Sequence, residues 1–413
     1  MPTTLFKNIG KLVNVRDHET LLRGPALAEL PILHNAWLLV EDGLISDFGS
    51  MDKIAIGLYN IPSQLDLTGS LVLPCWCDSH THLVFAASRE EEFVDKIKGM
   101  SYSDIAAKGG GILNSAAKLN ETSEGELFSQ AWKRLEQVRK MGTGAIEIKS
   151  GYGLSTEGEL KMLRVIKRLK EKSGMLIKST FLAAHAYPQQ FRNDHQGYIR
   201  LIIDEMLPRI SQDRLADYVD VFCEKDFFSP EETLQVCNAA QAHGLKIKLH
   251  ANQLTDSGAV QTGVALGAVS VDHLECMHDD SIKTLGNAST IGTMLPTAAF
   301  FLRMQYPPAR KLIDTGAAVA LATDYNPGSS PSGNMNLVLA MACIQMKMLP
   351  EEAINASTLN GAYAMEVEND AGSIRKGKKA NLIVTHSVPS LAYLPYSFGE
   401  DWIDKVMING EFV

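Results

Sequence analysis

Short apolar runs alternate with longer amphipathic stretches through most of this 413-residue chain, and this alternation constrains its fold more than any other feature. Eight runs have the length and composition of buried strands: residues 71–73, 144–148, 176–182, 218–222, 245–250, 270–273, 290–295 and 319–323. Helical periodicity between them is clearest at residues 156–172, 230–243 and 257–266. Strands that alternate with helices favour a parallel sheet, and eight strands close a barrel. The sequence therefore predicts an α/β fold with a (β/α)8 TIM barrel over residues 71–372.

Both ends of the chain carry strand patterns instead. Residues 36–40 and 44–48 flank Glu41-Asp42-Gly43, and residues 406–408 and 411–413 flank Asn409-Gly410. Both connections are typical of hairpin turns. Further strands are expected at residues 11–15 and 380–384. We predict that residues 1–70 and 373–413 together form a small β-sandwich domain.

Charge and hydropathy narrow the class of protein. The chain has 39 Lys and Arg against 48 Asp and Glu, a formal net charge of −9, whereas nucleic-acid binders usually carry a basic face. No uncharged apolar run approaches the ~18–20 residues of a membrane span. The N-terminal residues lack a signal peptide's apolar stretch, and the six cysteines are scattered. We expect a cytoplasmic protein with no nucleic-acid or membrane partner.

Histidines and an aspartate gather where the predicted strands end. They are His80 and His82 after the first strand, His185, His250 and His273 at the third, fifth and sixth, and Asp324 after the eighth. The carboxyl ends of barrel strands meet at one face, where barrel enzymes place their sites. Two histidines at i and i+2 on an extended segment point the same way, so both imidazoles can reach one metal ion.

Simpler interpretations exist for each of these residues alone. A lone His-x-His is weak evidence because surface pairs are common. His273 alone fits a hydrogen-bonded core histidine, and Asp324 alone fits a helix cap. The other six histidines fall in helices, loops or terminal segments and are interpreted as ordinary surface or structural residues: His18, His34, His195, His243, His278 and His386.

Longer motifs carry a resemblance to a known family that covers nearly the whole chain. They are His80-Thr81-His82-Leu83-Val84-Phe85, Arg89-Glu90-Glu91-Glu92-Phe93, Gly109-Gly110-Gly111-Ile112, Lys149-Ser150-Gly151-Tyr152-Gly153-Leu154, Phe181-Leu182-Ala183-Ala184-His185-Ala186, Val221-Phe222-Cys223-Glu224 and Thr323-Asp324-Tyr325-Asn326-Pro327-Gly328-Ser329-Ser330. The chain resembles the amidohydrolase superfamily and, within it, the imidazolonepropionase family. The His-x-His motif marks only the superfamily, whereas the segments at residues 149–153 and 324–330 narrow the resemblance to this family.

The resemblance implies one metal ion per chain, Zn²⁺ or Fe, held by His80, His82, His250 and Asp324. Three imidazoles and one carboxylate suit either metal. Binuclear superfamily members usually carry a bridging lysine at the end of the fourth strand. Here that position reads Phe222-Cys223-Glu224, so we predict a single metal.

The resemblance also implies hydrolysis of 4-imidazolone-5-propanoate to N-formimidoyl-L-glutamate, a step of histidine degradation, by a metal-activated water. The implied catalytic residues are Asp324, His273 and His185. The implied substrate-binding residues are Arg89, Tyr102, Tyr152, His185, Gln253, Asn326, Gly328 and Ser329. Arg89, with Tyr152 and the weaker candidate Tyr102, would bind the substrate carboxylate, because a guanidinium makes bidentate contacts with such a group.

One position departs from part of the family. Some members carry a glutamate where this chain has Gln253, and an amide cannot carry a proton. Gln253 is therefore interpreted as a hydrogen-bond partner of the substrate, and the acid–base work falls to His273 and Asp324. His273 is expected to lie near the metal without binding it.

Two alternative functions are weighed against this one. A cytosine or guanine deaminase would share the metal ligands but needs no carboxylate clamp, and Arg89 with Tyr152 argues against it. A non-catalytic scaffold usually loses ligands, whereas every ligand position is filled here. Related enzymes suggest that the protein is a homodimer. The expected partner is the small-molecule substrate.

Overall fold

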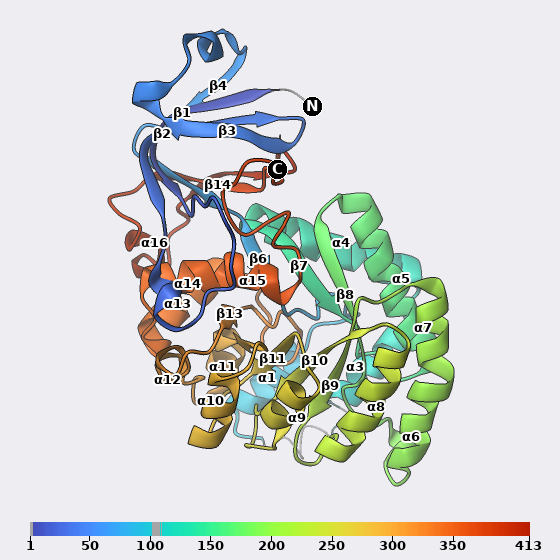
Figure 1. Cartoon of the computed structure of the whole chain (residues 1–413). Coiled ribbons are helices and arrows are strands. Elements are labelled where there is room, and N and C mark those ends of the chain that lie inside the picture. The colour runs from blue at the N-terminus through green and yellow to red at the C-terminus, as the bar shows by residue number, and fades with distance from the viewer. Residues whose placement is uncertain (1–2, 101–107, 109) are drawn as a thin grey trace.

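The larger unit of the fold is a parallel barrel surrounded by helices. The computed structural model describes residues 3–100, 108 and 110–413. Eight parallel strands follow one another in chain order around the barrel. Their bounds are β6 (Trp76–Asp78), β7 (Thr143–Lys149), β8 (Leu176–Ala184), β9 (Tyr218–Cys223), β10 (Lys246–Ala251), β11 (Ser270–His273), β12 (Ile291–Met294) and β13 (Val319–Leu321). Figure 1 shows these strands inside a ring of helices, so the predicted α/β barrel is confirmed.

The barrel closes between the segments that follow its first and last strands. The backbone N–H of Asp324 donates to the carbonyl of His80 at 3.0 Å, and that of His82 donates to the carbonyl of Tyr325 at 2.9 Å. Thr81 and Tyr325 form a parallel bridge at the same place. Closure therefore fixes the backbone of three predicted metal ligands against each other.

The expected first barrel strand belongs to the other sheet, which corrects the prediction for residues 71–73. These residues lie in β5 (Ser70–Pro74), which pairs in parallel with β1 and antiparallel with β14. The first barrel strand is β6, and it pairs with β7. A buried apolar run has the same composition in either sheet, because both kinds of strand are covered on both faces. The strands that pair with residues 71–73 could therefore be identified only from the three-dimensional structure.

The second sheet is built from both termini, as predicted. Its strands are β1 (Thr4–Val13), β2 (Ile32–Glu41), β3 (Leu44–Ser50), β4 (Ser63–Asp66), β5, β14 (Leu382–Ser387), β15 (Ile403–Ile408) and β16 (Glu411–Phe412). Their order is β16-β15-β14-β5-β1-β2-β3, with β4 paired to β1. The ring centroids of Phe6 and Phe412, from distant positions in this order, lie 6.3 Å apart. The sheet therefore curls over a shared apolar core that includes Phe6, Leu38 and Leu382. Figure 1 shows the blue and red strands together at one end of the molecule.

Some of the helices begin or end at recognisable capping signals. The Ser229 side chain and Glu232 form a capping box at the start of α8, and Pro230 occupies its first turn. Gly174, with φ of 66°, ends α5 in the left-handed conformation that glycine adopts without strain. The α-helices are α1 (Glu90–Ile97), α3 (Ile112–Glu121), α4 (Glu124–Lys140), α5 (Thr156–Ser173), α6 (His195–Leu201), α7 (Leu207–Asp213), α8 (Pro230–Ala242), α9 (Ala259–Ala265), α10 (Asp279–Gly286), α11 (Pro296–Leu302), α12 (Ala309–Asp314), α13 (Met335–Met346), α14 (Pro350–Ser357), α15 (Leu359–Ala364) and α16 (Tyr393–Tyr396). Short 3-10 segments cover Gly24–Ala28, Met51–Lys53, Ile56–Asn60 and Gln189–Phe191, and a π-helical turn covers Ile202–Met206. Among the described residues, no helix is both long and apolar enough to cross a bilayer.

The barrel interior holds a cluster of charged side chains. Five such residues are completely buried on four strands: Glu147, Lys149, Asp220, Lys248 and Asp272. Barrel interiors are ordinarily filled by branched apolar side chains. Burying a charge is costly unless the charge is paired. The function of the neighbouring site must therefore account for this cluster.

Candidate metal centre and active site

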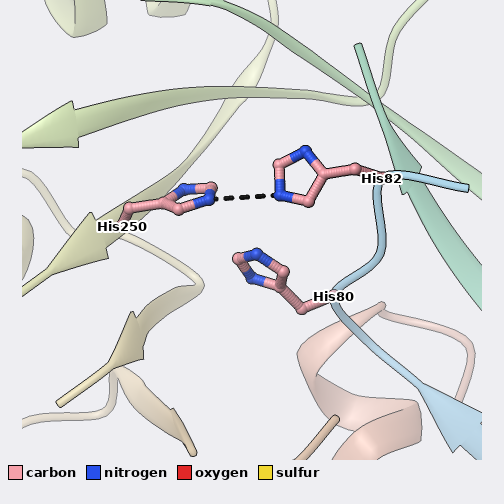
Figure 2. A group of neighbouring side chains, drawn as sticks. All are labelled: His80, His82 and His250. Carbon is pink, nitrogen blue, oxygen red and sulfur yellow. Dashed lines mark hydrogen bonds between the residues drawn. The ribbon is translucent and has the colours of Figure 1, made fainter. Parts of the chain in front are cut away.

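Three imidazoles converge at the carboxyl ends of the barrel strands. His80 and His82 follow β6, and His250 lies near the end of β10. Their ligand atoms all lie within 4.8 Å of one another. The Nε2 atoms of His82 and His250 are 3.4 Å apart. Figure 2 shows the three rings turned toward a common centre.

Asp324, the fourth predicted ligand, lies beside two of these histidines. Its Oδ1 lies 3.5 Å from Nε2 of His80 and 3.5 Å from Nε2 of His82. Ligand atoms of a tetrahedral site with bonds of about 2.1 Å are about 3.4 Å apart. The side chains of His80, His82 and Asp324 are at most 2 % exposed. Three separations within the predicted ligand set, His80–Asp324, His82–Asp324 and His82–His250, are thus close to the value for a tetrahedral site.

The hydrogen bonds of two histidines orient their free nitrogens. Nδ1 of His80 lies 2.6 Å from Oδ2 of Asp272, and Nδ1 of His250 lies 3.0 Å from Oδ2 of Asp220. A carboxylate accepts the Nδ1 proton and so leaves the Nε2 lone pair for a metal. Nε2 of His80 is buried and has no hydrogen-bond partner. The residues therefore fit a metal ion, as the chemistry of the donor set suggests.

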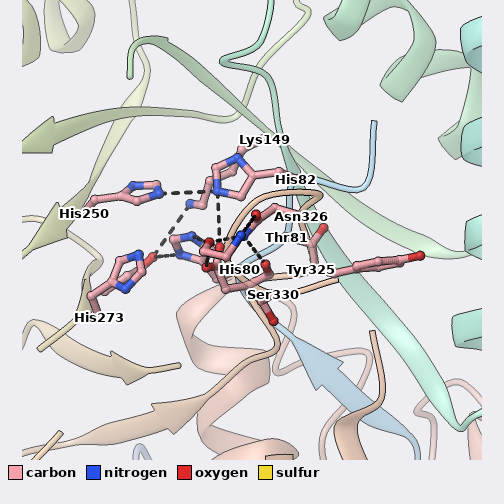
Figure 3. Close-up of polar contacts among 12 residues, drawn as sticks. His80, Thr81, His82, Lys149, His250, His273, Tyr325, Asn326 and Ser330 are labelled. Atoms are coloured by element: carbon pink, nitrogen blue, oxygen red, sulfur yellow. Dashed lines mark hydrogen bonds and ion pairs between the residues drawn. The ribbon is translucent and has the colours of Figure 1, made fainter. Parts of the chain in front are cut away.

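Electrostatics keep the imidazoles in the form that binds metal. Burial, assisted by Lys149 and the neighbouring histidines, lowers the pKa values of His80 and His82 well below the ordinary value. A neutral imidazole is the metal-binding form. Burial raises the pKa of Asp220, but contacts with His250 and Lys149 outweigh it, and the net pKa is far below the usual range. Figure 3 shows Lys149 among the polar contacts of the site.

His273 lies beside this group on β11. Its ring centroid is 5.3 Å from that of His250, and its ligand atom forms a second group of three with those of His80 and Asp324. Its Nδ1 is 3.3 Å from Oε1 of Glu275. Burial lowers the pKa of His273, but the carboxylates of Glu275, Asp324 and Asp272 together outweigh burial, so the net pKa is raised. The backbone φ angles of His273 and Asp324 are 89° and 53°, and such strain is typical of functional positions.

His185 and Tyr152 line the wall next to His82. The rings of His82 and His185 are stacked with centroids 5.2 Å apart, and Tyr152 lies 5.6 Å from His185. Burial lowers the pKa of His185 to about 3. Its Nδ1 lies 3.0 Å from the carbonyl of Gly151, which can only accept a hydrogen bond. His185 is therefore a neutral imidazole whose Nε2 is an acceptor. Burial also raises the pKa of Tyr152, which keeps its hydroxyl protonated.

The Arg89 guanidinium lines the same cavity near Tyr152. Its Nε donates to Oγ of Ser115 at 2.9 Å, and Glu92 lies 4.0 Å away. Its Cζ is 6.0 Å from the Tyr152 ring centroid. A Cβ at Gly328 would lie only 2.5 Å from Nη1 of Arg89. Because Gly328 has no side chain, there is room for the Arg89 guanidinium beside it.

The loop after β13 is organised by Asn326. Its Oδ1 accepts from the N–H groups of Gly328 and Ser329, both at 2.8 Å, and its Nδ2 donates to the Asp324 carbonyl at 2.6 Å. The Ser329 hydroxyl donates to Oδ2 of Asp324 at 3.2 Å. Asn326 therefore uses its amide within its own loop, where it shapes the surroundings of Asp324.

One cavity of about 880 Å³ joins the predicted residues. Its lining includes every predicted substrate-binding residue in the described part of the chain: Arg89, Tyr152, His185, Gln253, Asn326, Gly328 and Ser329. His82, His250, His273 and Asp324 also face it. The remaining candidate, Tyr102, lies outside the described residues. Phe93 and Phe301 stack at 5.4 Å in the same lining and make that part apolar.

Several residues that orient the site were not assigned a role from sequence. They are Lys149, Asp220, Asp272, Glu275 and Ser115. A signal existed for one of them, because Asp220 interrupts the otherwise apolar predicted strand at residues 218–222. Ser115 gave no signal, because it reaches Arg89 from a separate helix.

Comparison with known proteins agrees with this geometry. The Amidohydrolase family model matches residues 71–413. The imidazolonepropionase of Flavobacterium johnsoniae is 54% identical over 99% of this chain and 100% of that protein. The imidazolonepropionase of Christiangramia forsetii is 52% identical over 100% of both chains.

Solved structures share the fold at low sequence identity. The guanine deaminase of E. coli has a TM-score of 0.75 at 15% identity and covers 100% of this chain and 99% of its own. An adenosine deaminase from Xanthomonas campestris, with bound zinc, has a TM-score of 0.68 at 16% identity, covering 99% and 92%. These likenesses concern the architecture, whereas the relatives above share sequence over the full length. The chain belongs to the amidohydrolase family and, within it, to the imidazolonepropionases.

Proposed function

We propose that this chain hydrolyses 4-imidazolone-5-propanoate to N-formimidoyl-L-glutamate, a step in histidine degradation. The observation that carries the proposal is one cavity whose lining combines Arg89 with three of the predicted metal ligands, His82, His250 and Asp324. The ligand set suits hydrolysis of a ring amide, and Arg89 suits a substrate that also bears a carboxylate. A purine or pyrimidine deaminase substrate has no such group.

His80, His82, His250 and Asp324 would hold one Zn²⁺ or iron ion. When bound, such a metal polarises a carbonyl oxygen and lowers the pKa of water from 15.7 toward ~7. The buried Nε2 of His80 and the 3.4 to 3.5 Å separations support this assignment. Elemental analysis is expected to give one metal equivalent per chain, and two equivalents would contradict it.

Arg89 and Tyr152 bind and orient the substrate in this proposal. The guanidinium, held by Ser115, pairs with the propionate, and the Tyr152 hydroxyl donates to the same carboxylate. This pairing aims the ring at the metal ligands, and positioning of this kind supplies several kcal/mol of catalysis. The Gln253 side chain, which is 8% exposed and lines the cavity, completes the hydrogen bonds to the substrate.

His185 acts as a hydrogen-bond acceptor. Its Nδ1 proton is committed to the Gly151 carbonyl, so its Nε2 has no proton to give to a developing oxyanion. A ring N–H of the substrate supplies the matching donor. His185 therefore orients the substrate ring and does not stabilise negative charge on the oxygen of the ring carbonyl.

Asp324 and His273 move the protons. Asp324 accepts a proton from the attacking water as the water oxygen bonds to the ring carbonyl carbon. The bond between that carbon and the ring nitrogen then breaks, and His273 delivers a proton to the leaving nitrogen. The Glu275 carboxylate favours the protonated form of His273 that this step needs. The Ser329 hydroxyl steadies the Asp324 carboxylate.

The test is an activity assay with imidazolonepropanoate generated in situ from urocanate. Loss of imidazolone absorbance and formation of formimidoylglutamate are followed with and without a chelator. Chelator-sensitive turnover is expected. If a fully metal-loaded sample gives no acceleration, the proposal fails, and a panel of cytosine and guanine substrates follows.

The oligomeric state is a separate proposal. The resemblance to related enzymes suggests a homodimer, which sedimentation equilibrium tests directly. A monomer at micromolar concentration would contradict it.

A further inference from the structure

Lys149 is a completely buried lysine that takes no part in the reaction described above. It is the last residue of β7, and its ammonium group lies within the buried charged cluster of the barrel. Its Nζ is 2.9 Å from Oδ2 of Asp220 and 3.7 Å from Oδ2 of Asp272. These carboxylates come from β9 and β11, so Lys149 reaches across the barrel to strands that are not its neighbours.

The two oxygen atoms that face Lys149 are the ones that orient the metal ligands. Oδ2 of Asp220 contacts Nδ1 of His250 at 3.0 Å, and Oδ2 of Asp272 contacts Nδ1 of His80 at 2.6 Å. One ammonium group therefore lies against both carboxylate–histidine pairs. Such outer partners fix the tautomer and the direction of a ligand imidazole.

We propose that Lys149 is a positioning residue for the metal centre: its ammonium group holds Asp220 and Asp272 so that His250 and His80 present Nε2 to one metal ion. The proposal rests on the metal site of the proposed function and deepens it. Lys149 touches neither substrate nor metal, and it acts through the two carboxylates.

The surroundings of Lys149 support this role over a purely structural one. Its third partner is Glu147, at 2.5 Å, which also pairs with Lys248. Lys248 instead contacts the Ser79 carbonyl at 3.2 Å. The cluster contains three carboxylates and two ammonium groups, which leaves one negative charge in excess beneath a cation site. Without Lys149, Asp220 and Asp272 would lose the cation that contacts both, and each buried carboxylate could turn away from its histidine.

The test measures metal affinity by competition with a chelator of known affinity, in the full-length protein. Lys149→Met removes the ammonium group and keeps most of the side-chain volume. Loss of an outer-shell partner typically lowers metal affinity by about 10- to 100-fold, and we expect a loss in that range. The visible spectrum of the Co²⁺-loaded variant, which reports coordination geometry, should also change.

Lys378→Met is the matched control. Lys378 is 2% exposed, like Lys149 it is an almost fully buried lysine, and its Nζ donates to the Ala371 carbonyl at 2.6 Å and contacts Glu19 and Ser373. Its loss should lower thermal stability but leave metal affinity within about twofold. Equal loss of affinity in both variants would show a general effect of destabilisation and overturn the proposal.

A second variant covers the case in which Lys149→Met fails to fold. Glu147→Gln combined with Lys149→Met removes one charge of each sign, so the net charge of the cluster is unchanged, and the Gln amide oxygen can still accept a hydrogen bond from Lys248. Asp220 and Asp272 still lack their cation, so the same loss of affinity is expected. Wild-type affinity in this double variant would overturn the role of Lys149. Failure of the wild-type protein to bind metal would instead refute the proposed function.

Discussion

Gly328→Ala tests the substrate-binding side of the site without removing any functional group. The added Cβ would lie 2.5 Å from Nη1 of Arg89 and 3.2 Å from its Cζ. The guanidinium must retreat by about 1 Å to restore an ordinary contact of 3.4 Å or more. The backbone of Gly328 is not in the left-handed region, so alanine fits it without strain.

The expected effect is a loss of substrate binding with little change in stability. A hydrogen bond to a charged group contributes about 1.5–3 kcal/mol, and each 1.4 kcal/mol corresponds to a factor of about ten. Displacement of the Arg89 guanidinium should therefore lower kcat/KM by about 10- to 150-fold, mainly through KM. Steady-state kinetics of imidazolone loss measures the effect, and thermal unfolding shows that Tm is nearly unchanged.

Two comparisons make this prediction refutable. Gly125→Ala, on α4 where a Cβ meets nothing within 4 Å, should leave kinetics unchanged. In an Arg89→Ala background, Gly328→Ala should cost almost nothing more, because both changes remove the same contact. Wild-type kcat/KM in Gly328→Ala, or full additivity of the two changes, would show that Arg89 does not bind the carboxylate.

Four further predictions concern the metal and the protons. Asp324→Asn should lower kcat by about 100-fold or more even with metal bound, because a general base contributes about 10²–10⁴; near-normal turnover of the metal-loaded variant would remove Asp324 from that role. His273→Ala should reduce turnover while elemental analysis still gives one metal equivalent, and loss of metal would make His273 a ligand. Because the Glu275 carboxylate raises the pKa of His273, the protonated acid should be lost as pH rises through that pKa. Glu275→Gln should therefore move the alkaline limb of the kcat/KM profile to lower pH, and an unmoved limb would contradict this. Removing the metal should lower Tm, since a ligand at 100 times its Kd stabilises the folded state by about 2.7 kcal/mol; identical calorimetric scans with and without metal would refute this.

Most of the barrel could be predicted from sequence because its strands are covered on both faces. Such strands form continuous apolar runs, and the run at residues 319–323 begins at the same residue as β13 (Val319–Leu321). The run at residues 71–73 was equally apolar, but its partners β1 and β14 come from distant segments. The composition of an apolar run predicts that the strand is buried, but it does not predict which sheet the strand joins.

The convergence of the ligands was predictable for a related reason. A closed parallel barrel brings all strand ends to one face, so polar residues at those ends become neighbours. The orientation of each ring was not predictable. His80 depends on Asp272 across the barrel, and Arg89 depends on Ser115 from a separate helix. Contacts of this kind are set by three-dimensional register and leave no local pattern in the chain.

The closure of the barrel has a consequence for how the site comes into being during folding. The hydrogen bonds of Thr323 to Asp78 join residues 245 positions apart in the chain, and the backbone pairing of Asp324 with His80 directly follows them. Contacts of such high sequence separation form late, because the chain must lose the entropy of a long loop before these contacts can stabilise the fold. During synthesis, His80 and His82 therefore leave the ribosome long before Asp324 is present to complete the ligand set. Complete coordination of a metal would therefore follow barrel closure, and a pulse of metal during refolding should be captured fully only after β13 has docked.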